Sequence, residues 1–428
     1  MFLLENTIRD YAWGSPDAIQ HLLGRPVTGE PAAELWMGAH PGAPSRVFGG
    51  SEDGANLDTL IAEDAADLLG PAVVSAFGAR LPYLFKVLAA AKPLSLQAHP
   101  SPEQAKAGFR AEQAEGALAA DDPNRNYRDD QAKPELIAAL TRFEALCGFA
   151  EPTVVATRLD ALLAAGAPAG LRDLRATLLD GPPVQAIAAA LVSLLRPDEP
   201  DDIRDLVDAT VVTARALADA DADGTDPSIA LLPRLARDYP GDPGVLVSLL
   251  CNFVVLEPGQ ALYLPAGNLH AYCSGLGMEL MNASDNVLRG GLTPKHIDVD
   301  ELLHVLDTTP RPATPVEPTQ VEPGWVSYDT DAPSFELGRI DGPVTLPAAP
   351  QILFCASGSA HVTATGTGES RALGAGQSVF VPDVDGPVAV AEVAPGTSIF
   401  RAAPPRRLTA VPRTASSSSD TSDTEATA

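Results

Sequence analysis

The chain has 428 residues, of which 29 are Lys or Arg and 56 are Asp or Glu, so its formal net charge at pH 7 is −27. Hydrophobic residues make up 45% and charged residues 20%, which is the composition of a globular protein with a sizeable buried core. The acidic excess argues against nucleic acid or an anionic membrane as the main partner, because both require a basic face. The basic residues include five lysines: Lys86, Lys92, Lys106, Lys133 and Lys295.

Local features argue against export, membrane insertion and a disulfide framework. The most apolar helical run, residues 185–195, is shorter than the roughly 18 residues that cross a bilayer. Residues 1–10 lack a basic n-region, so we expect no signal peptide. The cysteines form no C-x-x-C pair, which favours buried reduced thiols in a cytoplasmic protein over a disulfide framework or a zinc knuckle. They are Cys147, Cys251, Cys273 and Cys355.

The first half of the chain changes from β to α character. Short strand-like runs at residues 34–38, 81–88 and 93–98 alternate with Gly and Pro, which is typical of a β sandwich or barrel rather than of βαβ units. Between residues 152 and 250, apolar residues recur at helical spacing, with Pro- or Gly-containing breaks. We expect helices at residues 153–164, 171–179, 184–195, 202–218 and 228–238.

Strand character returns after residue 250, at residues 252–256 and 261–264. Residues 309–323 contain five prolines and predict a linker or an extended crossing segment. Residues 414–428 are rich in Ser, Thr and Asp and predict a disordered tail. Further short strands are expected at residues 351–356, 361–365, 378–381 and 398–402.

A weak internal repeat links the two β regions. The run from Gly259 to Pro265 resembles the run from Gly376 to Pro382, since each has a Gly-Gln turn, four strand residues and a proline. The first copy continues to His270, in a pattern that resembles the second motif of the cupin jelly rolls, whose histidine is a metal ligand. The second copy has a proline in its place. We therefore predict two jelly rolls, one of which has lost the ligand; two unrelated β turns are the alternative.

Four residues have side chains that suit a divalent metal ion. Gln97 and His99 are two apart in a strand-like run, so their side chains face the same side. His270 follows a strand in a Gly-containing turn, and Glu135 would add a carboxylate. Two imidazoles, a carboxylate and an amide oxygen suit zinc, with one position left for water or substrate. From the pattern alone, a histidine in an apolar run is more often a core residue.

A second group of residues is cationic. The polar, glycine-containing stretch of residues 282–296 carries Arg289 and Lys295 and follows an apolar segment. All five lysines lie in residues 81–106, 126–149 and 257–307, whereas the rest of the chain uses arginine. A cluster of this kind would hold an anionic group, phosphate above all. A solvated charged loop is the alternative.

Eight short blocks of sequence stand out along residues 1–307. They are YAWGS (11–15), ELWMG (34–38), LPYLFKVL (81–88), PLSLQAHP (93–100), YRD (127–129), KPE (133–135), PAGNLH (265–270) and SDNVLRGGLTPK (284–295). These blocks, in the same order, resemble the type I mannose-6-phosphate isomerases, which are zinc-dependent cupin enzymes. The chain departs from the family at Gly290–Gly291, where an Ala-Gly step is common, and in its Ala/Pro/Asp-heavy helical region.

The resemblance implies a mainly β fold with an α-helical insertion, made of two cupin-type jelly rolls and a helical domain. A monomer is expected. The implied domains are a catalytic cupin in residues 1–151 with 251–308, a helical domain in 152–250, a second cupin-like domain without metal in 309–403 and a disordered tail in 404–428.

The resemblance also implies conversion of mannose 6-phosphate to fructose 6-phosphate through a cis-enediol, with one zinc ion held by Gln97, His99, Glu135 and His270. Arg289 corresponds to the family's proposed catalytic arginine and would stabilise the enediolate. Lys133, Glu279, Asp285 and Lys295 fall in or around the family's active site. The base at C2 stays open between Glu279 and Asp285, with Lys133 as a candidate proton shuttle. Substrate contacts are expected from Trp13, Lys86 and Ser95.

Two other functions compete with isomerisation. His99, His270 and Glu135 could form the 2-His-1-carboxylate iron site of a cupin dioxygenase. Gln97 as a fourth ligand and the lysine cluster argue against it. A sugar-phosphate sensor built on a degenerate isomerase is the second alternative, and the complete ligand set with Arg289 argues against that.

Overall fold

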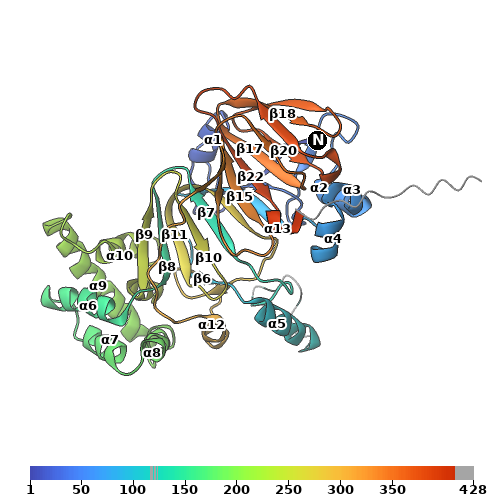
Figure 1. Cartoon of the computed structure of the whole chain (residues 1–428). Helices are drawn as coiled ribbons and strands as arrows, with labels where there is room; N and C mark the ends of the chain where they lie inside the picture. Colours follow the sequence, from blue (N-terminus) through green and yellow to red (C-terminus); the bar gives the residue numbers. More distant parts are fainter. Residues whose placement is uncertain (116–118, 120–121, 123, 410–428) are drawn as a thin grey trace, which may run out of the picture.

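The structure, a computed structural model, describes residues 1–115, 119, 122 and 124–409. Within these residues the chain forms antiparallel sheets and a separate block of helices, which lies beside one of the sheets (Figure 1). The expected combination of β sheets with a central helical stretch is confirmed, but helices and strands cover similar shares of the chain, so the fold is mixed α and β rather than mainly β. No helix within the described residues is both long and apolar enough to cross a membrane.

The first β unit, as we call it, surrounds the long strand β11 (His270–Asn282). The second half of β11 pairs with β5 and β7, and its first half pairs with β6 and β8. The strand changes sheets at Gly275, whose φ is 125° and where an added Cβ would lie 2.6 Å from the Phe143 side chain. The other strands are β2 (Thr7–Arg9), β3 (Glu34–Met37), β5 (Tyr83–Ala90), β6 (Gln97–Ala98), β7 (Glu135–Ala139), β8 (Phe143–Phe149), β9 (Cys251–Leu256), β10 (Ala261–Leu264) and β12 (Leu288–Arg289).

The second β unit consists of an eight-stranded and a four-stranded sheet with an apolar core. Two strands from the N-terminal region, β1 and β4, join its larger sheet, so the first and the last strands of the described residues lie in the same unit. The larger sheet contains, in spatial order, β13 (Thr319–Glu322), β14 (Trp325–Tyr328), β15 (Glu336–Ile340), β22 (Ser398–Ala403), β17 (Gln351–Ser357), β20 (Ser378–Val381), β1 (Phe2–Glu5) and β4 (Arg46–Phe48). The smaller sheet contains β16 (Val344–Leu346), β21 (Val388–Ala391), β18 (Ser359–Ala364) and β19 (Ser370–Gly374).

The five expected helices between residues 152 and 250 are present, each within two residues of the predicted bounds. Four of them begin with a proline in the first turn, where its missing N–H costs no hydrogen bond. Their apolar faces share one core with β8 and β9 of the first β unit. The helices are α6 (Pro152–Ala164), α7 (Gly170–Leu179), α8 (Pro183–Leu195), α9 (Pro200–Ala220) and α10 (Pro227–Asp238), followed by α11 (Gly244–Val247) and the 3-10 turn η1 (Ser248–Leu250).

Elsewhere the structure contains helices that the sequence patterns did not indicate. Within residues 1–108, three short helices fill residues 57–77, and the expected strand at 93–98 is reduced to β6. A further helix lies at the start of the predicted tail 404–428, the rest of which lies outside the described residues. These elements are α1 (Ala18–Leu22), α2 (Leu57–Glu63), α3 (Ala65–Leu69), α4 (Pro71–Phe77), α5 (Pro102–Glu115), α12 (Val299–Val305), α13 (Arg406–Thr409) and the 3-10 turn η2 (Asp383–Asp385).

The two copies of the sequence repeat adopt the same local structure. Gly259 and Gly376 have φ angles of 94° and 81°. The side-chain carbonyls of Gln260 and Gln377 each accept a hydrogen bond from the N–H three residues earlier, at 3.0 and 2.8 Å. Each turn then leads into a strand, β10 or β20, that pairs with β7 or β17.

Candidate metal centre

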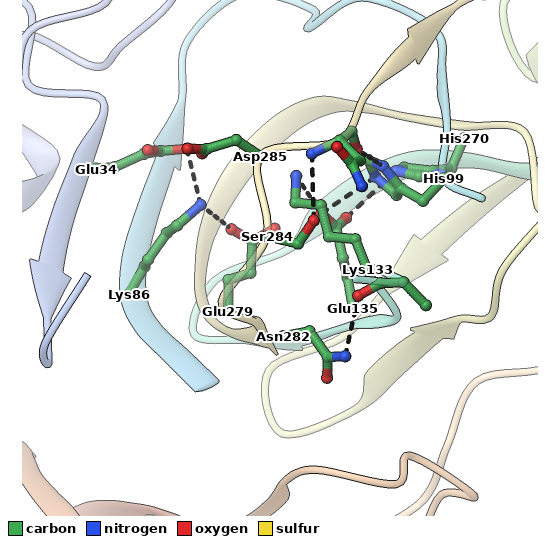
Figure 2. A network of polar contacts seen from close by, with 12 residues as sticks. Glu34, Lys86, His99, Lys133, Glu135, His270, Glu279, Asn282, Ser284 and Asp285 are labelled. Atoms are coloured by element: carbon green, nitrogen blue, oxygen red, sulfur yellow. Dashed lines mark hydrogen bonds and ion pairs between the residues drawn. The ribbon is translucent and has the colours of Figure 1, made fainter. Parts of the chain in front are cut away.

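Three of the four predicted metal ligands converge inside the first β unit. His99 follows β6, Glu135 begins β7 and His270 begins β11, and all three are buried. One ligand atom from each lies within 4.8 Å of the other two. Nε2 of His99 is 3.2 Å from one carboxylate oxygen of Glu135, and Nε2 of His270 is 3.3 Å from the other (Figure 2).

The hydrogen bonds of the two histidines show that this group fits a cation. Nδ1 of His99 lies 2.7 Å from the main-chain oxygen of Asn286, and Nδ1 of His270 lies 3.0 Å from that of Asn268. Because a carbonyl oxygen only accepts, each Nδ1 carries a proton, and in the neutral ring each Nε2 then presents a lone pair. Both lone pairs therefore face the carboxylate of Glu135, an arrangement that is repulsive unless a metal ion lies between them.

The electrostatics agree with ligands that bind without protons. Burial lowers the pKa of His99 to about 4, so its imidazole is neutral. Burial alone would raise the pKa of Glu135, but the Lys133 ammonium, 3.0 Å away, and the neighbouring histidines hold it well below its usual value. Metal ions are bound by neutral imidazole and ionised carboxylate, the forms that these pKa shifts favour for His99 and Glu135.

The sheet register places the fourth predicted ligand beside these three. Gln97 lies directly opposite His270 across β11 and β6, and directly opposite Arg289 across β6 and β12. Directly opposed residues of antiparallel strands point to the same face, so the three side chains form one row. Gln97 lines a cavity of about 50 Å³ together with Glu135 and His270, which is room for an ion with about one or two waters.

A buried acid–base group lines the same cavity. The ammonium of Lys86 is 3.0 Å from Glu279 and 3.5 Å from Glu34 (Figure 2). Burial opposes the charge on Lys86, but these two carboxylates outweigh it and raise the lysine pKa. Burial raises the pKa of Glu279, and the charge of Glu135 raises it further. The site therefore holds two buried carboxylates whose pKa values are shifted in opposite directions, that of Glu135 downward and that of Glu279 upward.

Cations gather at the other end of the row. Burial lowers the pKa of half-buried Arg289, and the charge of Arg128 lowers it further. Lys295 is mostly exposed, and partial burial together with Arg289 and Arg128 lowers its pKa. We call these three residues the cationic rim. Mutual repulsion of this kind favours an anion among the three cations.

The remaining predicted residues occupy the periphery. Asp285 is 54% exposed, and its carboxylate lies 3.6 Å from Nε2 of the buried His40. Trp13 is half-buried, stacks on Tyr11 and packs against the apolar interior of the first β unit. Ser95 is half-buried, two residues before Gln97.

The structure adds site residues that the sequence analysis did not select. Glu34 pairs with Lys86 and accepts a hydrogen bond of 2.6 Å from the indole of Trp36. Tyr272 lines the cavity, with its buried hydroxyl close to Glu279. Both lie close in sequence to recognised features, since Glu34 begins the ELWMG block and Tyr272 is two residues after His270 on the same strand. Arg128, the third member of the cationic rim, was also not selected.

These observations define a class of protein: antiparallel β sheets with a helical block, a buried His₂-carboxylate group that could hold a metal ion, and a cationic rim beside it. Residues 1–151 match the model for the phosphomannose isomerase type I catalytic domain. The chain is 37% identical to the mannose-6-phosphate isomerase of Escherichia coli, over 90% of this chain and 96% of the relative. It is 34% identical to that of Rattus norvegicus, over 80% and 82%.

The solved structures lead to the same family. A zinc-bound crystal structure of mannose 6-phosphate isomerase superposes with a TM-score of 0.83 at 32% identity, covering 94% of this chain and 99% of that one. The chain belongs to the type I phosphomannose isomerases.

Proposed function

We infer that the protein interconverts mannose 6-phosphate and fructose 6-phosphate. The observation that carries this inference is the buried metal centre, His99–Glu135–His270, adjoining the cationic rim in a chain that matches mannose-6-phosphate isomerases over nearly its full length. A metal-dependent isomerase of a sugar phosphate needs these two features side by side, because the reacting carbons and the phosphate belong to one small molecule.

Zinc fits the donor set, and Gln97, His99, Glu135 and His270 would hold it. When bound, it would polarise and orient the substrate oxygens at C1 and C2. Lys133, which lies 3.0 Å from Glu135, keeps that ligand ionised and thus ready to bind the metal.

The protein's own acid–base chemistry is assigned to Glu279 and Lys86. Glu279 is buried, lines the cavity and has a raised pKa, as a general base working near neutral pH requires. Asp285, the alternative, is 54% exposed. In this scheme Glu279 takes the proton from C2, the electron pair forms the C1–C2 double bond, and O1 takes a proton from the Lys86 ammonium. Glu279 then returns its proton to C1 as O2 gives its own proton to Lys86 and becomes the ketone oxygen.

The cationic rim is assigned to the negative charges of the substrate. Arg289 shares a row with Gln97 and His270, so its guanidinium can stabilise the enediolate and assist ring opening at O5. Lys295 and Arg128 stand beside it and are placed to hold the phosphate. The predicted roles of Trp13 and Ser95 in substrate binding remain proposals of the same kind.

We also propose that both β units are cupin-type jelly rolls, with the domain limits stated above except that β1 and β4 belong to the second unit. Their main sheets share one strand order, and the two Gly-Gln turns have the same hydrogen bonds. A cytoplasmic monomer is the expected form, and the four cysteines, all free and buried, suit a reducing compartment.

The direct test is to incubate the protein with mannose 6-phosphate and measure fructose 6-phosphate, with and without a chelator. We expect product in the untreated sample, its loss after chelation and its return with zinc. Absence of product from zinc-loaded protein would refute the isomerase, and oxygen uptake in the same sample would support the dioxygenase.

A further inference from the structure

The segment that leads into the metal ligand Glu135 has no helix or strand of its own. Residues 128–134 run in an irregular path, yet they carry Arg128 of the cationic rim and Lys133 beside the metal centre. Their backbone groups must find partners outside regular secondary structure. Most of those partners come from one short stretch, residues 282–286, at the end of β11 and just beyond it.

Asn286 supplies the largest share of these contacts. Its side chain is fully buried. Its amide oxygen accepts hydrogen bonds from the N–H groups of Arg128, at 2.7 Å, and Asp129, at 3.2 Å. Its amide nitrogen donates to the main-chain oxygens of Asp129, at 2.8 Å, and Gln131, at 2.9 Å. One side chain thus bonds four backbone groups across four residues of the segment.

Ser284 adds further bonds to the same segment. We call Ser284 and Asn286, together with the backbone that they hold, the clamp. The hydroxyl of Ser284 donates to the carboxylate of Asp129 at 2.8 Å and to the main-chain oxygen of Gln131 at 3.2 Å (Figure 2 shows Ser284). It also accepts the N–H of Asn286 at 3.3 Å. Ser284 and Asn286 thus hold residues 129 and 131 through hydrogen bonds and are also bonded to each other.

The main chain of Asn286 acts on the metal centre itself. Its carbonyl oxygen is the acceptor, at 2.7 Å, for the Nδ1 proton of His99. That bond fixes the tautomer and the ring orientation that aim Nε2 at Glu135. A shift of the Asn286 backbone would therefore turn His99, while loss of its side-chain bonds would release Arg128.

We propose that Asn286 is a positioning residue that holds the metal centre and the cationic rim in one fixed arrangement. Its carbonyl orients His99, and its amide fixes the segment that carries Arg128. The part that concerns Arg128 rests on the proposed phosphate-binding role of the rim. The part that concerns His99 does not, since it is a statement about metal affinity alone.

The test compares Asn286→Ala with Thr397→Val. Thr397 is a matched control in the second β unit, because its buried hydroxyl also clamps a loop, through bonds to Ser359 and Ala394. Zinc affinity is measured by competition with a chelator, and phosphate affinity by calorimetric titration of inorganic phosphate into zinc-loaded protein. Neither readout requires turnover, so both stand even if the isomerase assignment fails.

Asn286→Ala keeps the carbonyl that accepts from His99 but removes the side-chain bonds that hold this backbone in place, so we expect zinc binding to weaken by about tenfold, the low end of the range for removal of a partner of a metal ligand. Phosphate affinity should fall by roughly tenfold, as for loss of one charge-assisted hydrogen bond. Thr397→Val should lower the melting temperature while leaving both affinities within about twofold of the original protein.

The proposal is overturned if Asn286→Ala changes only thermal stability, as the control does, or if just one of the two affinities falls. Should Asn286→Ala fail to fold, Ser284→Ala decides by the same criterion, because it removes the hydroxyl from the clamp but keeps the amide of Asn286. A fall in both affinities beyond the control then supports the proposal, and unchanged affinities refute it.

Discussion

Each β unit has a sheet in which six strands follow the same order, but the two units differ in the residues that their interiors contain. In the first, the strand order is β10, β7, β11, β5, β3 and β2, and in the second it is β20, β17, β22, β15, β14 and β13. All neighbours in both series are antiparallel. Because the Gly-Gln turns precede β10 and β20, the register allows positions of the two sheets to be compared residue by residue.

The comparison places residues of different charge at matching positions. Glu135 lies opposite Leu264, just before a proline, and Gln351 lies opposite Val381, also just before a proline. Two residues further along β7, the residue opposite is Glu279. Two residues further along β17, it is Arg401, so a buried acidic residue in the first unit corresponds to a buried basic residue in the second. Proline also replaces the ligand His270 in the second copy of the repeat.

In the second unit, the buried cation Arg401 is paired with groups of the protein itself. The guanidinium of Arg401 donates to Gln351 at 2.6 Å, lies 3.5 Å from Glu336 and packs over Trp325. Burial lowers its pKa to about 10, which leaves it charged near neutral pH. In the first unit, by contrast, two imidazole lone pairs and a carboxylate face one point. The same strand order thus surrounds a candidate metal site where electron-rich groups converge, and a closed core where a cation is paired with an anion.

The largest expected effect comes from removing a ligand in the first unit. His270→Ala should lose its zinc and lower kcat/KM by roughly 10³-fold or more, because the metal contributes several kcal/mol to the transition state. Zinc content and a coupled isomerase assay measure both. His361→Ala, an exposed histidine of the second unit, is the control and should change neither. A His270→Ala protein with one zinc and full activity would show that the ligand assignment is wrong.

A substitution of Glu279, the buried acid that corresponds to Arg401, tests whether it is the general base. Glu279→Gln should lower kcat by about 10²- to 10⁴-fold, the usual contribution of a general base. Because the base acts ionised and its pKa is raised, the rate of the unaltered protein should fall as the pH drops through that raised pKa, and this acidic limb should disappear from the residual activity of Glu279→Gln. Glu144→Gln, which removes a carboxylate 2.6 Å from Arg234 outside the cavity, should keep the limb. An unchanged limb in Glu279→Gln would assign the base elsewhere.

Arg289 tests whether the cationic rim acts on the transition state. Arg289→Ala should lower kcat by about 10²- to 10³-fold while zinc stays bound, since it would remove charge stabilisation of the enediolate and no ligand. Arg175→Ala, which breaks an ion pair with Asp160 in the helical region, is the control. Near-normal kcat in a zinc-loaded Arg289→Ala protein would contradict the role.

Arg401 tests the second unit, where we expect an effect on stability alone. Arg401→Ala should lower the free energy of unfolding by about 3 kcal/mol, because it opens a cavity and breaks a buried ion pair. Denaturant unfolding measures this. Zinc content and kcat/KM should stay within about twofold. A large loss of either at unchanged stability would mean that the second interior takes part in function.

The sequence predicted those parts of the fold that depend on local patterns. The five helices between residues 152 and 250 are correct within two residues, because each has a full apolar period and most have a proline start. The helices at residues 57–77 were missed, since none exceeds seven residues and so none shows a complete stripe. The 13-residue strand β11 was also missed, because it changes sheets at Gly275 and has no single alternation.

The metal centre was predictable for a similar reason. Gln97 and His99 are two apart in one extended run, and His270 stands in a repeated turn motif. The sequence analysis did not select Glu34, Arg128 and Asn286, because their partners are far away in sequence. Asn286 acts on backbone groups some 155 residues earlier, which no local pattern can reveal. Such contacts become visible only when the strand register is known.

Zinc titration of the metal-free protein tests the central claim most directly. Chelator-treated protein is supplied with increasing zinc, and fructose 6-phosphate formation from mannose 6-phosphate is measured at each addition. We expect no activity at the start, a linear rise and a break at one zinc per chain, with no rise in His270→Ala. Full activity in protein shown to be free of metal would contradict the account.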